Sequence, residues 1–299
     1  MIAGLLMLGG GAAAGLFGSL LGLGGGVLIV PLLTLGFGRP LREAVAVSLV
    51  CVIVTSSAAA GAYLRGRVAN LRLGAVLALF TASGALVGAL LAFVIPERML
   101  AGLFALLLAY VAVTMGRAGL KATRPAPGAV APVPVDPPAT PAADGGVQVV
   151  AGQSDSRPDP APSDAEPVGR LDGPGYRVRR VAPASVASLG AGIIAALLGV
   201  GGGVINVPTM NLLMGVPLRV ATATSNLMIG VTAVASAIIY VFRGGLDPYI
   251  AAPTALGVFV GASVGARVAH RIDVRILRLL FVVVLGYTSL QMAMRALGG

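Results

Sequence analysis

Two glycine clusters in otherwise apolar sequence are the part of this chain best suited to bind a ligand. They lie at residues 22–26 (GLGGG) and 199–203 (GVGGG). In hydrocarbon every backbone N–H and C=O group needs a partner, so a helix break survives only inside protein or beside a polar cavity. Glycines leave the amides of such a break uncovered. The helix that restarts near Val27 or Val204 points the positive end of its dipole at the break. We therefore predict an anion site that needs no buried lysine or arginine.

The two clusters belong to a long internal repeat. LLGLGGGVLIVP at residues 20–31 returns as LLGVGGGVINVP at residues 197–208, and 18 of 34 positions are identical between residues 15–48 and 192–225. The chain is therefore two copies of one unit, each interrupted by Gly and Pro at the same place. Such matched interruptions are the best sequence indication of a transporter's substrate site. The alternative interpretation is that the glycines only let helices pack closely.

The composition is that of a membrane protein. Hydrophobic residues make up 57% of the chain, only 11% of the residues are charged, and the mean hydropathy is +0.95. The net charge of +10 is carried by basic residues at the ends of apolar stretches, so membrane orientation explains it better than nucleic acid does. One cysteine and one histidine exclude a disulfide framework and a zinc site of the usual kind. We expect the lipid bilayer as surroundings, and no cofactor, metal or nucleic acid.

Each half contains four apolar stretches. They are expected at residues 2–36, 44–64, 71–95 and 98–117, and at residues 183–213, 220–242, 248–269 and 274–294. Three per half have the length of one bilayer crossing, whereas the first is longer and should form two helical pieces around its glycine break. We predict an all-α polytopic membrane protein with a first repeat at 1–120, a linker at 121–182 and a second repeat at 183–299.

The linker at residues 121–182 holds 12 of the 20 prolines and 7 of the 11 acidic residues. A segment of this composition cannot bury enough apolar surface to offset its ordering entropy, so we expect a mobile linker. A regulatory or partner-binding role is the alternative.

The basic residues favour inverted repeats. If each half crosses the membrane an odd number of times, 16 of the 21 Lys and Arg residues lie on the linker side and 5 on the other side. An even number of crossings, with parallel halves, gives a split of only 13 to 8. The positive-inside bias therefore predicts inverted halves with the linker in the cytoplasm.

Polar residues gather around the second break more than around the first. Asn206, Asn211, Thr222 and Thr224 correspond to Ile29, Thr34, Val45 and Val47 of the first half; Ser225 keeps a serine partner in Ser48. Hydroxyls and amides can donate hydrogen bonds to a bound oxyanion, although bonding between helices is the alternative for each. The predicted substrate-binding residues are Gly22, Gly24, Gly25, Gly26, Pro31, Ser48, Gly199, Gly201, Gly202, Gly203, Asn206, Pro208, Ser225 and Asn226.

The stretches lack the residues that catalysis would need. Four acidic residues lie outside the linker, and all fall at the expected ends of apolar stretches: Glu43, Glu97, Asp247 and Asp273. The sequence therefore does not favour a proton relay of carboxylates through the membrane core. Cys51 lies in an apolar run and is expected to be an inert buried thiol. No Ser/His/Asp or Cys/His arrangement fits the spacing, and we do not expect an enzyme.

The paired motifs GLFGSLLGLGGGVLIVPLL and GIIAALLGVGGGVINVPTM, each followed by Pro-Leu-Arg-x-Ala and a serine-containing helix, resemble those of the TauE/SafE family. This resemblance implies a multi-pass permease of the bacterial inner membrane. Its substrates would be small sulfur-containing anions, sulfite or organosulfonates such as sulfoacetate, and the implied direction is export. The family's glycine-rich motif falls on the glycine and proline positions named above. The long linker departs from compact members. An anion channel and a non-transporting membrane scaffold remain alternatives, and the sequence leaves the coupling ion and the oligomeric state open.

Overall fold

The computed structural model describes residues 2–20, 26–65, 69–121, 178, 180–268 and 274–298. Within these residues all regular structure is helical. The first half contains α1 (Ile2–Leu20), α2 (Gly26–Pro31), the π-helical turn η1 (Leu32–Gly36), α3 (Leu41–Arg65), α4 (Leu71–Val94) and α5 (Glu97–Lys121). The second half contains α6 (Val181–Leu198), α7 (Gly203–Pro208), the π-helical turn η2 (Thr209–Leu213), α8 (Leu218–Phe242), α9 (Pro248–Val268) and α10 (Val274–Gly298). The prediction of an all-α fold is confirmed.

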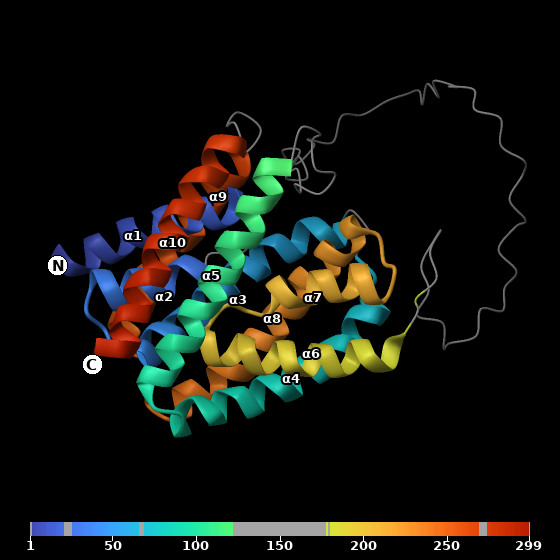
Figure 1. Cartoon of the computed structure of the whole chain (residues 1–299), viewed down its shortest axis with the longest axis horizontal. Helices are drawn as coiled ribbons and strands as arrows, with labels where there is room; N and C mark the ends of the chain where they lie inside the picture. The colour runs from blue at the N-terminus through green and yellow to red at the C-terminus, as the bar shows by residue number, and fades with distance from the viewer. Residues whose placement is uncertain are drawn as a thin grey trace, which may run out of the picture.

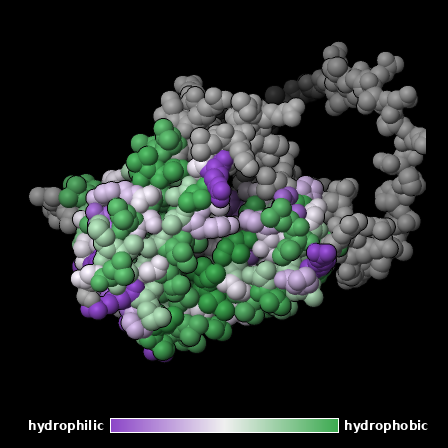
Figure 2. Space-filling model, in the orientation of Figure 1, coloured by the Kyte–Doolittle hydropathy of each residue, from purple (hydrophilic) through white to green (hydrophobic). Residues whose placement is uncertain are grey.

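Six of the described helices, α4, α5, α6, α8, α9 and α10, are long and apolar enough to cross a membrane. Many of their large apolar side chains point outward; Leu79, Phe242 and Leu256, for example, are all exposed. Figure 2 shows apolar surface over much of one face, with hydrophilic residues mainly toward its margins. Outward apolar side chains on long helices are what lipid contact requires. The chain is a multi-pass membrane protein.

The first helix of each half packs on a helix of the other half. Side chains added at Gly84 and Gly88 of α4 would strike the backbone of Leu189 and Ile193 of α6. Side chains added at Gly261 and Gly265 of α9 would meet Ala12 and Leu16 of α1 in the same way. These contacts correspond one to one through the 177-residue offset, and α4 lies beside α6 in Figure 1. Glycines at these positions therefore serve close helix packing.

Equivalent helices of the two halves pack in opposite directions. The Ser56 hydroxyl of α3 donates to the carbonyl of Asn226, near the start of α8. Between α5 and α10, Ser289 donates to Ala105, and Gly116 lies opposite Val282, so residue numbers rise in one helix as they fall in the other. Antiparallel packing of equivalent helices is what an inverted repeat requires, and it supports that prediction.

The short helices after the breaks end in π-helical turns for a local reason. Pro31 and Pro208 each close an α-helical segment, and the next five residues are π-helical. Proline has no N–H and its ring displaces the carbonyl one turn back, which favours a wider turn. Beside these turns, Thr34 donates to the Val30 carbonyl at 2.8 Å and Thr209 to that of Ile205 at 2.8 Å.

Candidate substrate site

The second break is a four-residue glycine-rich turn between α6 and α7. Gly199, Gly201 and Gly202 have φ of 69°, 79° and 77°, the left-handed region that residues with a side chain rarely adopt. The Gly199 N–H donates to Ala195 and ends α6, and the Gly202 carbonyl accepts from Asn206 N–H at 3.0 Å and begins α7. The expected break, with a helix restarting at Gly203 rather than Val204, is therefore present in the second half.

Two branched side chains cover the glycines from α3 and α8. A Cβ at Gly26 would lie 2.6 Å from Cγ2 of Val52, and a Cβ at Gly203 would lie 2.5 Å from Cδ1 of Ile229. Val52 and Ile229 are equivalent in the repeat, and both also approach Gly201. The starts of α2 and α7 thus meet α3 and α8 in one central region, where larger residues would not fit.

Asn206 and Ser225 carry unsatisfied polar atoms in this region. Both residues are 1% exposed. Among the described residues, neither amide atom of Asn206 nor the hydroxyl oxygen of Ser225 has a hydrogen-bond partner. A Cβ at Gly202 would lie 3.6 Å from Nδ2 of Asn206, and one at Gly203 would lie 3.7 Å from Oγ of Ser225. Both side chains therefore border the second break. Buried polar groups in native proteins are nearly always paired, so their unused capacity points to a ligand.

Ser48, the equivalent of Ser225, has a different environment. Its hydroxyl donates to the carbonyl of Gly26 at 3.0 Å and to that of Gly199 at 2.7 Å. Because a hydroxyl has one proton, these two bonds share it, and Ser48 links the break region of one half to that of the other. In this structure Ser48 connects the two break regions, whereas the hydroxyl of Ser225 has no partner among the described residues.

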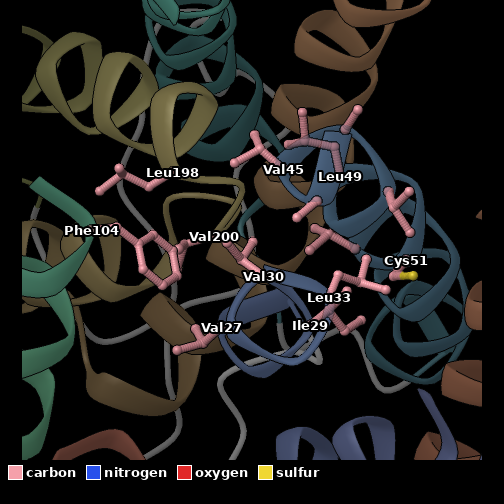
Figure 3. Close-up of a cluster of buried hydrophobic side chains, with 14 of the residues drawn as sticks. Val27, Ile29, Val30, Leu33, Val45, Leu49, Cys51, Phe104, Leu198 and Val200 are labelled. Carbon is pink, nitrogen blue, oxygen red and sulfur yellow. The ribbon is translucent and has the colours of Figure 1, made fainter. Parts of the chain in front are cut away.

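The first break offers an apolar counterpart. Ile29 stands where the second half has Asn206, and it is fully buried in a cluster with Val30, Leu33 and Val45. Figure 3 shows these side chains around α2, with Val200 of the second break facing Val30. Equivalent positions are thus apolar in the first half and polar in the second, and the asymmetric site, with more donors from the second half, stays a prediction.

The other predicted site residues are placed as follows. Gly22, Gly24 and Gly25 lie outside the described residues. Asn226 is half-buried, and its carbonyl accepts from Ser56. Pro31 and Pro208 lie at the ends of α2 and α7, one turn or more from the glycines.

Two polar residues that the sequence placed near the site have structural partners. The Asn211 amide donates to the carbonyl of Val216 at 2.9 Å and closes the turn after η2. The Thr224 hydroxyl accepts from the backbone N–H of Asn70, at the start of α4. Neither group needs a ligand for its hydrogen bond.

Sequence reasoning did not assign a role to Tyr240, although its match with Tyr63 marks the repeat. Tyr240 is fully buried, and its hydroxyl donates to the carbonyl of Ala196 at 3.1 Å. It holds the end of α6, three residues before the break. The sequence feature that could have indicated this role is the tyrosine kept at the same position of both repeats.

The described residues contain no group of three or more His, Cys, Asp or Glu side chains that would hold a metal ion. Glu43 lies in the first turn of α3, Glu97 begins α5 and Asp247 precedes α9, so these three carboxylates lie at helix ends as expected. Cys51 is buried among apolar side chains. Asp273 and His270 lie outside the described residues.

A multi-pass helical protein with a glycine-rich helix break in its second half and uncharged donors beside that break resembles membrane transporters in its architecture. Comparison with family models agrees with this class: the model described as "Sulfite exporter TauE/SafE" matches residues 7–292. The chain belongs to this family, whose members are membrane exporters of sulfite and related sulfur compounds. Neither the curated proteins nor the solved structures include a match to it.

Proposed function

We propose that this protein is a secondary transporter that exports a small sulfur-containing anion, sulfite or an organosulfonate, across the bacterial inner membrane. The substrate site lies at the central region between the two breaks. Backbone amides of Gly26 and of residues 201–203 face the oxyanion, and Asn206, Ser225 and Asn226 add side-chain donors. Ser48 positions the breaks. The linker lies in the cytoplasm.

The observation that carries the proposal is the set of unused polar atoms at Asn206 and Ser225. An amide N–H₂ and a hydroxyl supply three protons, and an oxyanion with several acceptor oxygens takes them without a buried cation. Leaving such groups unpaired costs about 1–3 kcal/mol each. A site occupied by substrate during each transport cycle removes that cost.

Alternating access then follows from the repeat. The Ser48 bonds, and the covering of the breaks by Val52 and Ile229, join elements of both halves at one place. Rocking of one helix bundle against the other around this fixed place would expose it to each side in turn. An anion channel would use the same site without alternation, so saturable flux and counter-transport separate the two.

Flux into proteoliposomes tests the proposal. Purified full-length protein is reconstituted, and uptake of radiolabelled sulfite, sulfate, taurine and sulfoacetate is measured with and without a pH gradient. We expect saturable uptake of sulfite or a sulfonate. Asn206→Ile installs the residue that the first half carries at the equivalent place, so it should fold and lose uptake. Ser263→Ala, which removes an exposed hydroxyl of α9, is the control. Parent-like uptake by Asn206→Ile would contradict the assigned site.

Deletion of residues 125–175 separates transport from the scaffold alternative. We expect the shortened protein to keep full anion flux. If flux requires the linker, the linker is part of the machinery rather than a connection.

A further inference from the structure

Two arginines and one aromatic ring form a group at one end of the helix bundle, which we call the distal arginine cluster: Arg42, Arg243 and Phe93. The Cζ atoms of Arg42 and Arg243 lie 5.8 and 5.6 Å from the centroid of the Phe93 ring. Arg42 is in the first turn of α3, Phe93 is in the last turn of α4, and Arg243 caps the C-terminus of α8. Elements of both halves thus bring two positive charges to one ring.

The cluster lies at the end of the bundle opposite to Lys121, the last residue of α5. Arg42 donates to the carbonyl of Ile95 at 2.9 Å, and α5 begins two residues later. α5 has 25 residues and is about 37 Å long at 1.5 Å per residue, so the linker leaves the bundle at the opposite end. On its inner side, Phe93 packs against Tyr240 with ring centroids 5.2 Å apart. The cluster shares no residue with the site at Asn206 and Ser225.

The acidic side chains nearby are already paired with a different arginine. Arg39 contacts Glu43 at 2.6 Å and Asp247 at 3.5 Å. The hydrogen bond with Glu43 raises the pKa of Arg39, as do the charges of both carboxylates. The described residues form two ion pairs, Arg39–Glu43 and Arg39–Asp247. Arg42 and Arg243 have no carboxylate partner there.

Arg42 has an unused donor as well as an unpaired charge. It is half-buried, and its Nε is buried without a hydrogen-bond acceptor among the described residues. A partly desolvated guanidinium that lacks a counter-charge, and whose Nε lacks an acceptor, is unfavourable. The second guanidinium beside the same ring adds repulsion. A bound anion would supply the counter-charge and an acceptor for Nε, and it would reduce the repulsion between the two guanidinium groups.

We propose that the distal arginine cluster is a second oxyanion site. Arg42 presents Nε and a terminal nitrogen to two oxygens of the anion, the paired geometry that guanidinium favours. Arg243 is exposed and closes over the anion from the water side. The ligand is a small oxyanion with at least two accessible oxygens, either a free anion of the sulfite, sulfate or phosphate type or the phosphate of a lipid headgroup. This site goes beyond the proposed function and does not depend on it.

The repeat does not carry the same three residues to the equivalent positions. Through the 177-residue offset, Arg42 corresponds to Arg219, but Arg243 corresponds to Gly66 and Phe93 to His270. The second arginine and the phenylalanine therefore have no identical counterpart in the repeat. An oxyanion site at this end would raise the local concentration of anions there.

A tryptophan probe tests the proposal directly. The chain contains no tryptophan, so Phe93→Trp introduces a single tryptophan, which can be excited selectively, and keeps a ring for the guanidinium groups. The full-length variant in phosphatidylcholine nanodiscs is titrated with sulfate, and its emission is recorded. We expect a saturable change. Adding Arg42→Gln or Arg243→Gln should weaken it about tenfold or more, the contribution of one charge-assisted hydrogen bond.

The matched control is Arg98→Gln. Arg98 is exposed at the start of α5, at the same end of the bundle, so its removal changes net charge equally and should leave the titration unchanged. Asn206→Ile in the Phe93→Trp background should also leave it unchanged. That result separates this site from the central one, whether or not the central site binds anions.

Lipid composition identifies the source of the anion. In nanodiscs containing phosphatidylglycerol, an emission change that needs no sulfate and disappears with Arg243→Gln assigns the site to a lipid phosphate. A response to sulfate in phosphatidylcholine assigns it to a free anion. The proposal is overturned if emission is unchanged by sulfate and by phosphatidylglycerol, or if the Arg42→Gln and Arg243→Gln variants respond as Phe93→Trp alone does. Loss of the response in Asn206→Ile would also overturn it.

Discussion

Removing the hydroxyl at two equivalent serines should have opposite consequences, because Ser48 is fully used and Ser225 is not. In Ser48→Ala the carbonyls of Gly26 and Gly199 lose a shared donor, in a position that water does not reach. In Ser225→Ala no hydrogen bond is lost, because the hydroxyl has no partner among the described residues.

The size of the difference follows from these contacts. A buried acceptor that loses its donor costs about 1–3 kcal/mol. For chains of 150–250 residues, 1 kcal/mol shifts Tm by about 2–4 °C, so Ser48→Ala should unfold about 2–12 °C below the parent. Ser225→Ala removes an unpaired polar atom and leaves a small void, two effects that offset one another, so its Tm should stay within about 2 °C.

Anion binding should show the reverse order. Ser225→Ala removes a donor to the substrate and should weaken sulfite binding about tenfold or more, as expected for a hydrogen bond to a charged group. Thermal unfolding in detergent and sulfite-dependent stabilisation measure both quantities on the same samples. Equal Tm losses in the two variants would refute the reasoning, as would a Ser225→Ala variant that sulfite stabilises as strongly as it does the parent.

Three further predictions concern the break, the topology and the coupling. Gly202→Leu should insert normally but lose anion binding, because its side chain would lie beside the Asn206 amide; Gly202→Ala should be milder. The control is Gly215→Ala, because Gly215 has a similar φ of 72° and an added Cβ there meets open space; this variant should bind the anion as the parent does. Parent-like binding by Gly202→Leu would show that the break only serves packing. A cysteine at position 273 should be labelled only from the cytoplasm, as at position 140; labelling from the periplasm would contradict inverted halves. Sulfite titrates near neutral pH and taurine keeps its sulfonate ionised, so sulfite flux should respond more to a pH gradient, and neutralising single carboxylates should leave that response intact. Loss of the response, with binding retained, in any one variant would identify that residue as the proton carrier. The carboxylates to replace are Glu43, Glu97, Asp247 and Asp273.

The helical elements and the second break were predictable because their causes are local. Stretches of about 20 apolar residues can satisfy their backbone in lipid only as helices, and the expected stretches agree with α3–α5 and α8–α10 to within a few residues. Clustered glycine with a following proline interrupts a helix whatever packs against it. The repeat is a property of the sequence itself, and so is the excess of polar residues in the second copy.

Tertiary structure decided which of those polar residues has a partner. Ser48 and Ser225 are the same residue at equivalent positions, yet only Ser48 finds acceptors, one of them 151 residues away. Asn206 is left unpaired while Asn211, five residues later, is bonded. The ion pair that joins Arg39 to Asp247 spans 208 residues, and its existence leaves Arg42 without a counter-charge. Hydrogen-bond partners of buried groups come from whichever helix packs there, so local sequence does not contain this information, and the assignment of the candidate site required the folded chain.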